Sequence, residues 1–179
     1  QNPTANTIYF FRAFDVTHNR PVLLEPNKQF PSLTTRGAAL TFNIAGLPAG
    51  VATEGVITDA SSTATDVPFG DLALGAETEV AQRLTITTNA AFGYQIFAYQ
   101  RQGLIGPTEI SPVATTNEAP DAWAVPPSAA GAFGYHAGDD ALSGGSSRFA
   151  PNNTYAQMES IPKEIAANSH PVGNESNDI

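Results

Sequence analysis

The strongest hydrophobic pattern in this chain of 179 residues lies between residues 83 and 99. Apolar and polar side chains alternate over residues 84–88, which is the period of a strand with one buried face. Residues 89–93, Asn-Ala-Ala-Phe-Gly, predict a turn because Asn and Gly tolerate positive φ. Residues 94–99 are apolar on both faces, which is typical of a strand in the middle of a β-sandwich. The region therefore predicts a β-hairpin at the core of an all-β domain.

Short strand-like patterns recur along the rest of the chain. Residues 39–44 alternate cleanly, and the Gly- and Pro-containing residues 46–50 end that pattern. Further strands are expected at residues 51–58, 132–137 and 154–158, with a proline-containing edge piece at 67–70. No pattern predicts a helix of three turns, although residues 163–167 are long enough for one helical turn. We expect an antiparallel β-sandwich, jelly-roll or immunoglobulin-like, of roughly eight to ten short strands.

An aromatic segment precedes this domain. Residues 7–14 read Thr-Ile-Tyr-Phe-Phe-Arg-Ala-Phe and have the highest strand propensity in the chain. Such a strand is apolar on both faces, so it needs cover on both sides. Residues 17–36 contain three prolines and predict turns. We divide the chain into an extended N-terminal arm, residues 1–36, and a β-sandwich domain, residues 37–179.

Composition narrows the class of protein. Only 14% of residues are charged, against the usual quarter, and such surfaces are common in secreted, filamentous and cell-wall proteins. The net charge of −9 argues against nucleic acid and anionic membranes as partners. No apolar run reaches the roughly 18–20 residues of a membrane span. The absence of cysteine excludes disulfides and thiolate metal sites. We expect an extracellular, cell-surface protein.

Charge is distributed unevenly between the two parts. The arm carries four basic and two acidic side chains, whereas the remaining residues carry four basic and fifteen acidic ones, a net charge of −11. Two interpretations stay open. The asymmetry is either a solvated surface without further meaning, or a basic arm that docks on an acidic body in the same chain or a neighbouring one.

No catalytic site is expected from the titratable residues, and we expect that the chain is not an enzyme. His18, His136 and His170 lack metal-ligand spacing. A triad of His136, Asp139 or Asp140 and a serine can be drawn, but no G-x-S-x-G nucleophile elbow occurs. No cofactor is expected, with one exception. Asp139 and Asp140 lie in a Gly/Ser loop that is either a calcium site or a solvated turn.

Two kinds of residue suggest contact with sugars. Trp123 lies in a long proline-rich excursion, residues 102–127, where it either stacks on a glycan or partner or pins the loop to its own core. Asn152 and Asn174 fit the N-x-[ST] acceptor rule for glycosylation. Glycans are therefore candidate ligands and candidate modifications.

Residues 85–95, TITTNAAFGYQ, resemble a motif of predicted secreted bacterial surface proteins, T-x-T-x-N-A-x-x-G-Y. Residues 67–72, Val-Pro-Phe-Gly-Asp-Leu, are similar to their V-P-F-G-x-L segment, and matches to F-G-Y, R-F and Y-A follow at residues 133–135, 148–149 and 155–156. The resemblance spans about residues 40–160 and implies a β-sandwich. It implies no catalytic residue. Such proteins continue into two more strands, whereas this sequence stops at Ile179, so either the sequence is trimmed or the sandwich is incomplete.

An incomplete sandwich exposes an apolar groove that a strand from another subunit can fill, as in donor-strand pilus and biofilm-fibre subunits. We expect a secreted structural subunit of a pilus-like filament or surface layer, a homopolymer assembled by donor-strand exchange. The residues expected to form the subunit interface are Ile8, Tyr9, Phe10, Phe11, Arg12 and Phe14. The alternative is a monomeric adhesin or carbohydrate-binding module that uses Trp123 and the loop at residues 102–127.

Overall fold

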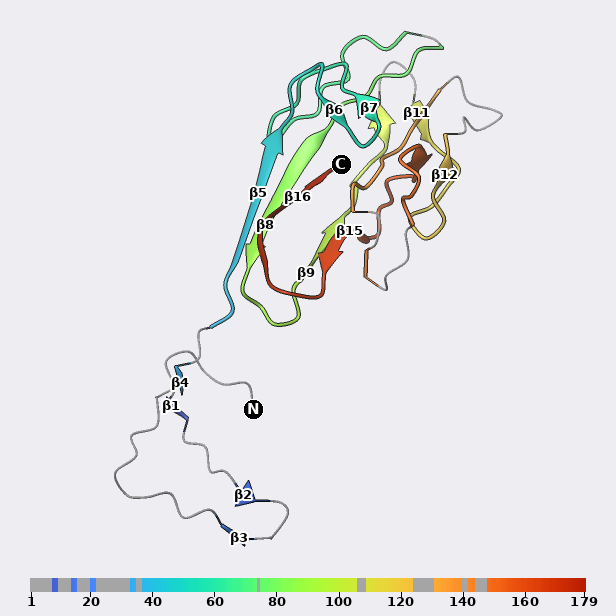
Figure 1. Cartoon of the computed structure of the whole chain (residues 1–179). Coiled ribbons are helices and arrows are strands. Elements are labelled where there is room, and N and C mark those ends of the chain that lie inside the picture. The colour runs from blue at the N-terminus through green and yellow to red at the C-terminus, as the bar shows by residue number, and fades with distance from the viewer. Residues whose placement is uncertain are drawn as a thin grey trace. The chain divides into compact units, whose positions relative to one another are not determined.

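The computed structural model describes residues 37–73, 75–105, 109–123, 131–139, 142–143 and 148–179, together with four two-residue strands earlier in the chain. Within these residues every regular element is a strand, so the expected all-β class is confirmed (Figure 1). The strands are β1 (Ile8–Tyr9), β2 (Phe14–Asp15), β3 (Arg20–Pro21), β4 (Leu33–Thr34), β5 (Leu40–Gly46), β6 (Ala52–Thr53), β7 (Val56–Ile57), β8 (Gln82–Thr88), β9 (Tyr94–Ala98), β10 (Leu104–Ile105), β11 (Glu109–Pro112), β12 (Asp121–Ala122), β13 (Ala132–Phe133), β14 (Thr154–Tyr155), β15 (Lys163–Asn168) and β16 (Val172–Asp178). The described part of the chain holds no helix long and apolar enough to cross a membrane.

The chain divides into two compact units, residues 1–38 and residues 39–179. In the first unit β1 pairs with β4, and β2 pairs with β3, both antiparallel. The predicted interface residues Ile8, Tyr9 and Phe14 therefore belong to two short pairings inside their own unit. Three others lie outside the described residues: Phe10, Phe11 and Arg12. Their use as a donor strand stays a prediction.

Two sheets form the frame of the second unit. The first has the order β16-β8-β5, and the second pairs β15 with β9; all these pairings are antiparallel. Along β8 the side chains of Leu84, Ile86 and Thr88 are buried, so the alternation expected from the sequence sets the inner face of the first sheet. Two antiparallel layers with a shared apolar core are consistent with a β-sandwich.

The expected hairpin between β8 and β9 is wrong. The turn after Thr88 carries the chain from one sheet to the other, so β8 lies between β5 and β16 while β9 pairs with β15. Gly93, at φ 66°, lies in this turn. A Cβ at Gly93 would be 1.7 Å from the carbonyl oxygen of Asn168, so this turn packs directly on the connection between β15 and β16. Turn residues predict a reversal, but they do not determine whether its two strands pair.

The expected helical turn at residues 163–167 is also wrong, because this segment forms β15. Ile165 and Ala166 are consecutive and both buried, since the register with β9 shifts between Glu164 and Ala166. Such a bulge breaks the period of two by which strands are predicted. The expected strand at residues 51–58 is instead the pair β6 and β7, joined by Glu54 and Gly55 at positive φ.

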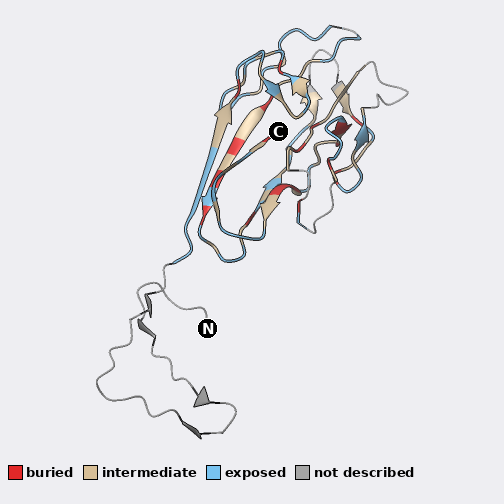
Figure 2. Cartoon of the chain, in the orientation of Figure 1, coloured by how far each residue is buried: buried red, intermediate tan, exposed pale blue. Residues whose placement is uncertain are grey.

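The core lies between the two sheets and the shorter strands that follow β9. Its buried members include Leu84 and Ile86 from the first sheet, and Tyr94 and Ala166 from the second. Phe149, which has no exposed surface, joins them from the loop before β14. The smaller sheets β6-β7, β10-β11-β13 and β12-β14 complete the described part of the unit. Figure 2 shows the buried residues along β8, whereas the beginning of β5 is exposed.

Candidate functional site

One inner face of the frame carries apolar side chains that are not covered. Leu40 and Phe42 of β5 pair with Thr88 and Ile86 of β8, and residues directly opposite in a sheet present their side chains on the same face. Ile86 is 1% exposed, whereas Phe42 is 45% and Leu40 is 63% exposed. Adjacent strands on one face therefore differ sharply in burial. The core covers β8 and stops short of the first half of β5.

The arrangement of the sheets explains this difference. The chain passes directly from β8 to β9 and from β15 to β16, so β9 and β15 lie across the core from β8 and β16 (Figure 1). The hydroxyl of Tyr94 in β9 donates a hydrogen bond of 2.8 Å to Glu175 in β16, which ties the two layers together. The second sheet has two strands and the first has three. Within the described residues, no strand pairs with the free edge of β9, and Leu40 and Phe42 of β5 stay exposed.

Both strands that border this open position have an unpaired edge within the described part of the chain. β5 is the last strand of its sheet, and β9 is the last strand of the other. The expectation that β9 lies in the middle of the sandwich is therefore wrong. Its outer face is partly open as well, since Phe97 and Tyr99 are each 52% exposed. Unpaired strand edges with apolar neighbours are templates for an additional strand.

These residues were not singled out by the sequence. The alternation in residues 39–44 predicts one apolar face, but a pattern does not show whether another layer covers that face. Phe92, in the turn between β8 and β9, is a further exposed apolar side chain, at 93%. We call the surface formed by the inner face of β5 and the free edge of β9 the open groove. It comprises Leu40, Phe42, Ile44 and the backbone of Tyr94–Ala98.

Asp139 has a structural role in its loop. Its two carboxylate oxygens accept hydrogen bonds from the backbone N–H groups of Leu142 and Ala167, at 3.3 and 2.6 Å. These bonds attach the loop to β15. Asp140 lies outside the described residues, and within those described no group of three or more His, Asp or Glu residues is placed to hold a metal ion. Calcium binding by Asp139 and Asp140 stays a prediction.

His136 is buried among aromatic rings. Its Nδ1 lies 2.8 Å from the carbonyl oxygen of Thr154, and its ring packs edge-on against Phe149 with centroids 5.6 Å apart. Nε2 is 4.0 Å from a carboxylate oxygen of Glu54. Both oxygens of Asp139 accept backbone N–H groups, and Asp140, the other carboxylate of the drawn triad, lies outside the described residues. The geometry supports a packing role for this histidine.

Trp123 contacts its own domain. Its ring meets that of Tyr155 edge-on, with centroids 5.2 Å apart, and the side chain is half-buried. Burial and the neighbouring carboxylate of Glu79 raise the pKa of Tyr155 to about 12, and the Tyr155 hydroxyl lies 3.4 Å from Glu79. Trp123 thus holds the described part of its loop against its own domain, which was one of the two alternatives left open by the sequence. A glycan contact at this residue stays a prediction.

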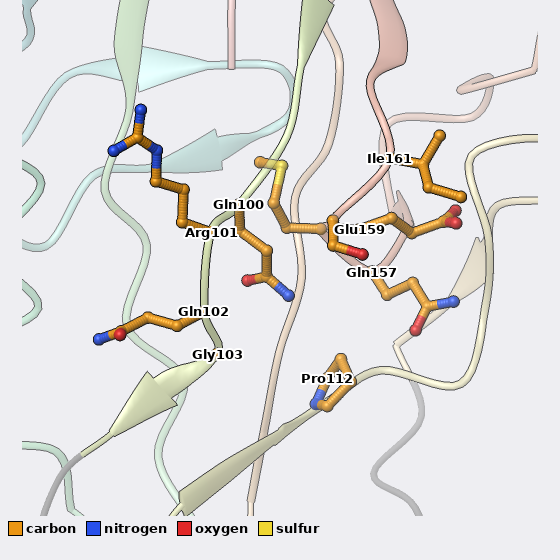
Figure 3. Close-up of a pocket in the computed structure, with 10 residues that line it drawn as sticks. Gln100, Arg101, Gln102, Gly103, Pro112, Gln157, Glu159 and Ile161 are labelled. Atoms are coloured by element: carbon orange, nitrogen blue, oxygen red, sulfur yellow. The ribbon is translucent and has the colours of Figure 1, made fainter.

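A polar cavity of about 330 Å³ lies where the segment after β9 runs beside the segment before β15. Figure 3 shows Gln100, Arg101 and Gln102 along one side and Gln157 and Glu159 along the other. The backbone N–H of Gln100 donates to the carbonyl of Glu159 at 2.8 Å, which holds the two segments together. The amide side chains offer both donors and acceptors. The cavity does not include Trp123.

The two predicted glycosylation residues are both exposed. Asn152 lies in the turn before β14, where its side chain is close to Gly55. Asn174 lies within β16 at φ 56°, and its Oδ1 accepts a hydrogen bond of 3.0 Å from the hydroxyl of Thr87. Exposure makes both residues accessible in the folded chain. Their modification stays a prediction.

A pair of charged residues that the sequence did not single out joins β16 to the central strand β8 at one end of the first sheet. Asp178 is buried, accepts two hydrogen bonds of 2.7 Å from Arg83, and accepts a third of 2.6 Å from the hydroxyl of Thr53. Burial opposes ionisation of Asp178, but these hydrogen bonds outweigh it and lower its pKa. The pair therefore fixes the end of β16 against β8.

Comparison of the chain with protein-family models finds no match, and comparisons with curated proteins and with solved structures find none either.

Proposed function

We propose that this chain is a secreted structural subunit of a cell-surface filament or surface layer, and that copies assemble by exchanging strands. The single observation that carries the proposal is the open groove. Leu40 and Phe42 lie on the core side of a sheet and yet stay 63% and 45% exposed. Exposed apolar faces of this kind commonly mark interaction sites, and in a subunit such a face provides an attachment point. The fold we propose is an open β-sandwich of the jelly-roll or immunoglobulin-like type.

The chemistry of the chain suits a non-covalent polymer. Cysteine is absent, so disulfides cannot link subunits. An inserted strand combines a ladder of main-chain hydrogen bonds with the burial of apolar side chains, each worth about 1.5–3 kcal/mol when fully buried. The arm supplies five large apolar side chains in an eight-residue segment: Ile8, Tyr9, Phe10, Phe11 and Phe14. The low proportion of charged residues fits an extracellular assembly.

The polar cavity supports a second candidate function, a monomeric carbohydrate-binding module or adhesin. Gln100, Gln102 and Gln157 contribute amide groups that can pair with sugar hydroxyls. Apolar cover in the cavity comes from Pro112, Met158 and Ile161, and none of the described residues that line it is aromatic. Sugars commonly pack on such rings, so we rank this function second.

Electron microscopy of the purified chain separates the two functions. The subunit function predicts filaments or sheets of uniform width from the full chain, and dispersed particles after deletion of residues 1–16. The module function predicts dispersed particles in both preparations together with binding to a glycan array. Dispersed particles from the full chain at all concentrations and ionic strengths would refute the subunit function.

A further inference from the structure

We infer that the open groove accepts residues 7–14 of a second copy, and that this strand enters with Tyr9, Phe11 and Ala13 facing β5. The inference rests on the proposed function and specifies the partner, the acceptor strand and the inward face. The groove follows from the unequal number of strands that the two sheets have in the described part of the chain. A strand added to the free edge of β9 would extend the second sheet over β5.

The geometry selects β9 as the strand that pairs with the donor. A strand added to the free edge of β5 would lengthen the first sheet, but it would leave the inner face of β5 open. A strand added to β9 occupies the position across from β5, where it covers Leu40 and Phe42 and pairs with the free edge of Tyr94–Ala98. One addition on this side removes both the open face and the unpaired edge of β9.

Alternation decides which side of the donor faces inward. Successive side chains of a strand point to opposite faces, so residues 7–14 have an odd-numbered and an even-numbered face. Arg12 is on the even-numbered face. Burying it would cost free energy, because the inner face of β5 offers no carboxylate to pair with a guanidinium. The odd-numbered face is free of charge and presents three consecutive inward positions: Tyr9, Phe11 and Ala13.

The outer face of β9 matches the other side of the donor. Phe97 alternates with the inward Ile96 and is 52% exposed, so it has room for a neighbour on the added strand. With the odd-numbered face inward, Ile8 and Phe10 point outward beside β9. Aromatic and aliphatic side chains on neighbouring strands of one face then pack together, while Arg12 stays in solvent. This placement accounts for the exposed aromatic residue on β9.

A second copy is the occupant that fits the first unit. Within one chain, β1 pairs with β4 and β2 pairs with β3, each over two residues. Insertion into β9 exchanges these two short pairings for one longer ladder. The net charge of +2 on residues 1–36 is opposite to the −11 on the remaining residues, which favours approach of an arm to another copy's domain.

Disulfide cross-linking between two single-cysteine variants tests the inference, because the natural chain has no cysteine. The acceptor variant is Phe97→Cys, and it is mixed with one donor variant at a time before oxidation. The matched donors are Phe10→Cys and Phe11→Cys, adjacent residues on opposite faces. We expect about tenfold more linked dimer from Phe10→Cys, because disulfides require Cα atoms within about 7 Å and side chains on the same face.

Each other outcome of the cross-linking experiment overturns one part of the inference. More linked dimer from Phe11→Cys than from Phe10→Cys would show that the even-numbered face of the donor strand points inward. No linkage with any donor position from 8 to 13, while filaments still form, would reject β9 as the acceptor and leave the subunit function standing. A chain that carries both Phe10→Cys and Phe97→Cys and links only to itself would reject the second copy as the occupant. Failure of the natural chain to assemble would refute the proposed function itself.

Discussion

Replacement of Phe42 by Ala should weaken both folding and assembly, by about the same amount. A fully buried Phe side chain contributes about 1.5–3 kcal/mol. Phe42 is 45% exposed in the single chain, so roughly half of that contribution, about 1 kcal/mol, is present before assembly. The rest is gained only when a strand covers β5. Phe42→Ala should therefore lower the free energy of unfolding by about 1 kcal/mol and raise the concentration needed for assembly about fivefold.

Ile86→Ala provides the matched control, because Ile86 is paired directly with Phe42 but is 1% exposed. Its loss should cost about 2–5 kcal/mol of folding stability, since a buried cavity is added to the lost burial. Urea unfolding of each variant lacking residues 1–16 gives the stability, and sedimentation of the full chains gives the assembly threshold. The reasoning is refuted if Phe42→Ala destabilises the fold as much as Ile86→Ala does, or leaves the assembly threshold unchanged.

Three further predictions concern the frame itself. Asp178→Asn should cost about 2 kcal/mol at neutral pH. In the natural chain the pKa of Asp178 is lower in the folded state than the unfolded-state value of about 3.9, so ionised Asp178 stabilises the fold above that value. This stabilisation is lost as the pH falls through the folded-state pKa. The urea midpoint of Asp178→Asn should therefore depend less on pH below about 5 than that of the natural chain. Gly93→Ala should lower the free energy of unfolding by about 3 kcal/mol, because the added Cβ would clash with the backbone at Asn168. Gly50→Ala is the control: Gly50 has φ 82° but open space around it, so only the backbone strain remains, and urea unfolding should show a cost of about 1–2 kcal/mol. Asp139→Ala removes two hydrogen bonds to backbone N–H groups, so it should cost about 1–2 kcal/mol of stability and lower the melting temperature. If EDTA lowers the melting temperature of the natural chain, the loop binds a cation as well.

The sequence predicts strand positions better than strand partners. Residues 84–88 and 39–44 alternate, and both segments form strands of the first sheet because one face of each is directed to the core side. Pairing depends on where the turn after Thr88 directs the chain, which the residues of the turn do not encode. The bulge near Ala166 hid β15, since it breaks the period of two.

The candidate site was predictable only in part. The aromatic segment at residues 7–14 indicates a strand that needs cover, and the absence of cysteine indicates non-covalent linkage. The open groove is not visible in the sequence, because the exposure of Phe42 depends on how many strands the facing sheet contains. Asp139 is a second such case. Its residue type and loop left a calcium site and a solvated turn open, and the sequence did not show that its carboxylate accepts backbone N–H groups in the fold.

The most direct test of strand exchange is the melting temperature of the chain lacking residues 1–16, measured with a synthetic peptide of residues 7–14. Peptide at a hundred times its dissociation constant stabilises the folded domain by about 2.7 kcal/mol, which corresponds to a rise of about 5–10 °C for a domain of this size. The account predicts this rise, and no rise with a peptide of the same composition in scrambled order. An unchanged melting temperature, or an equal rise with the scrambled peptide, would contradict it.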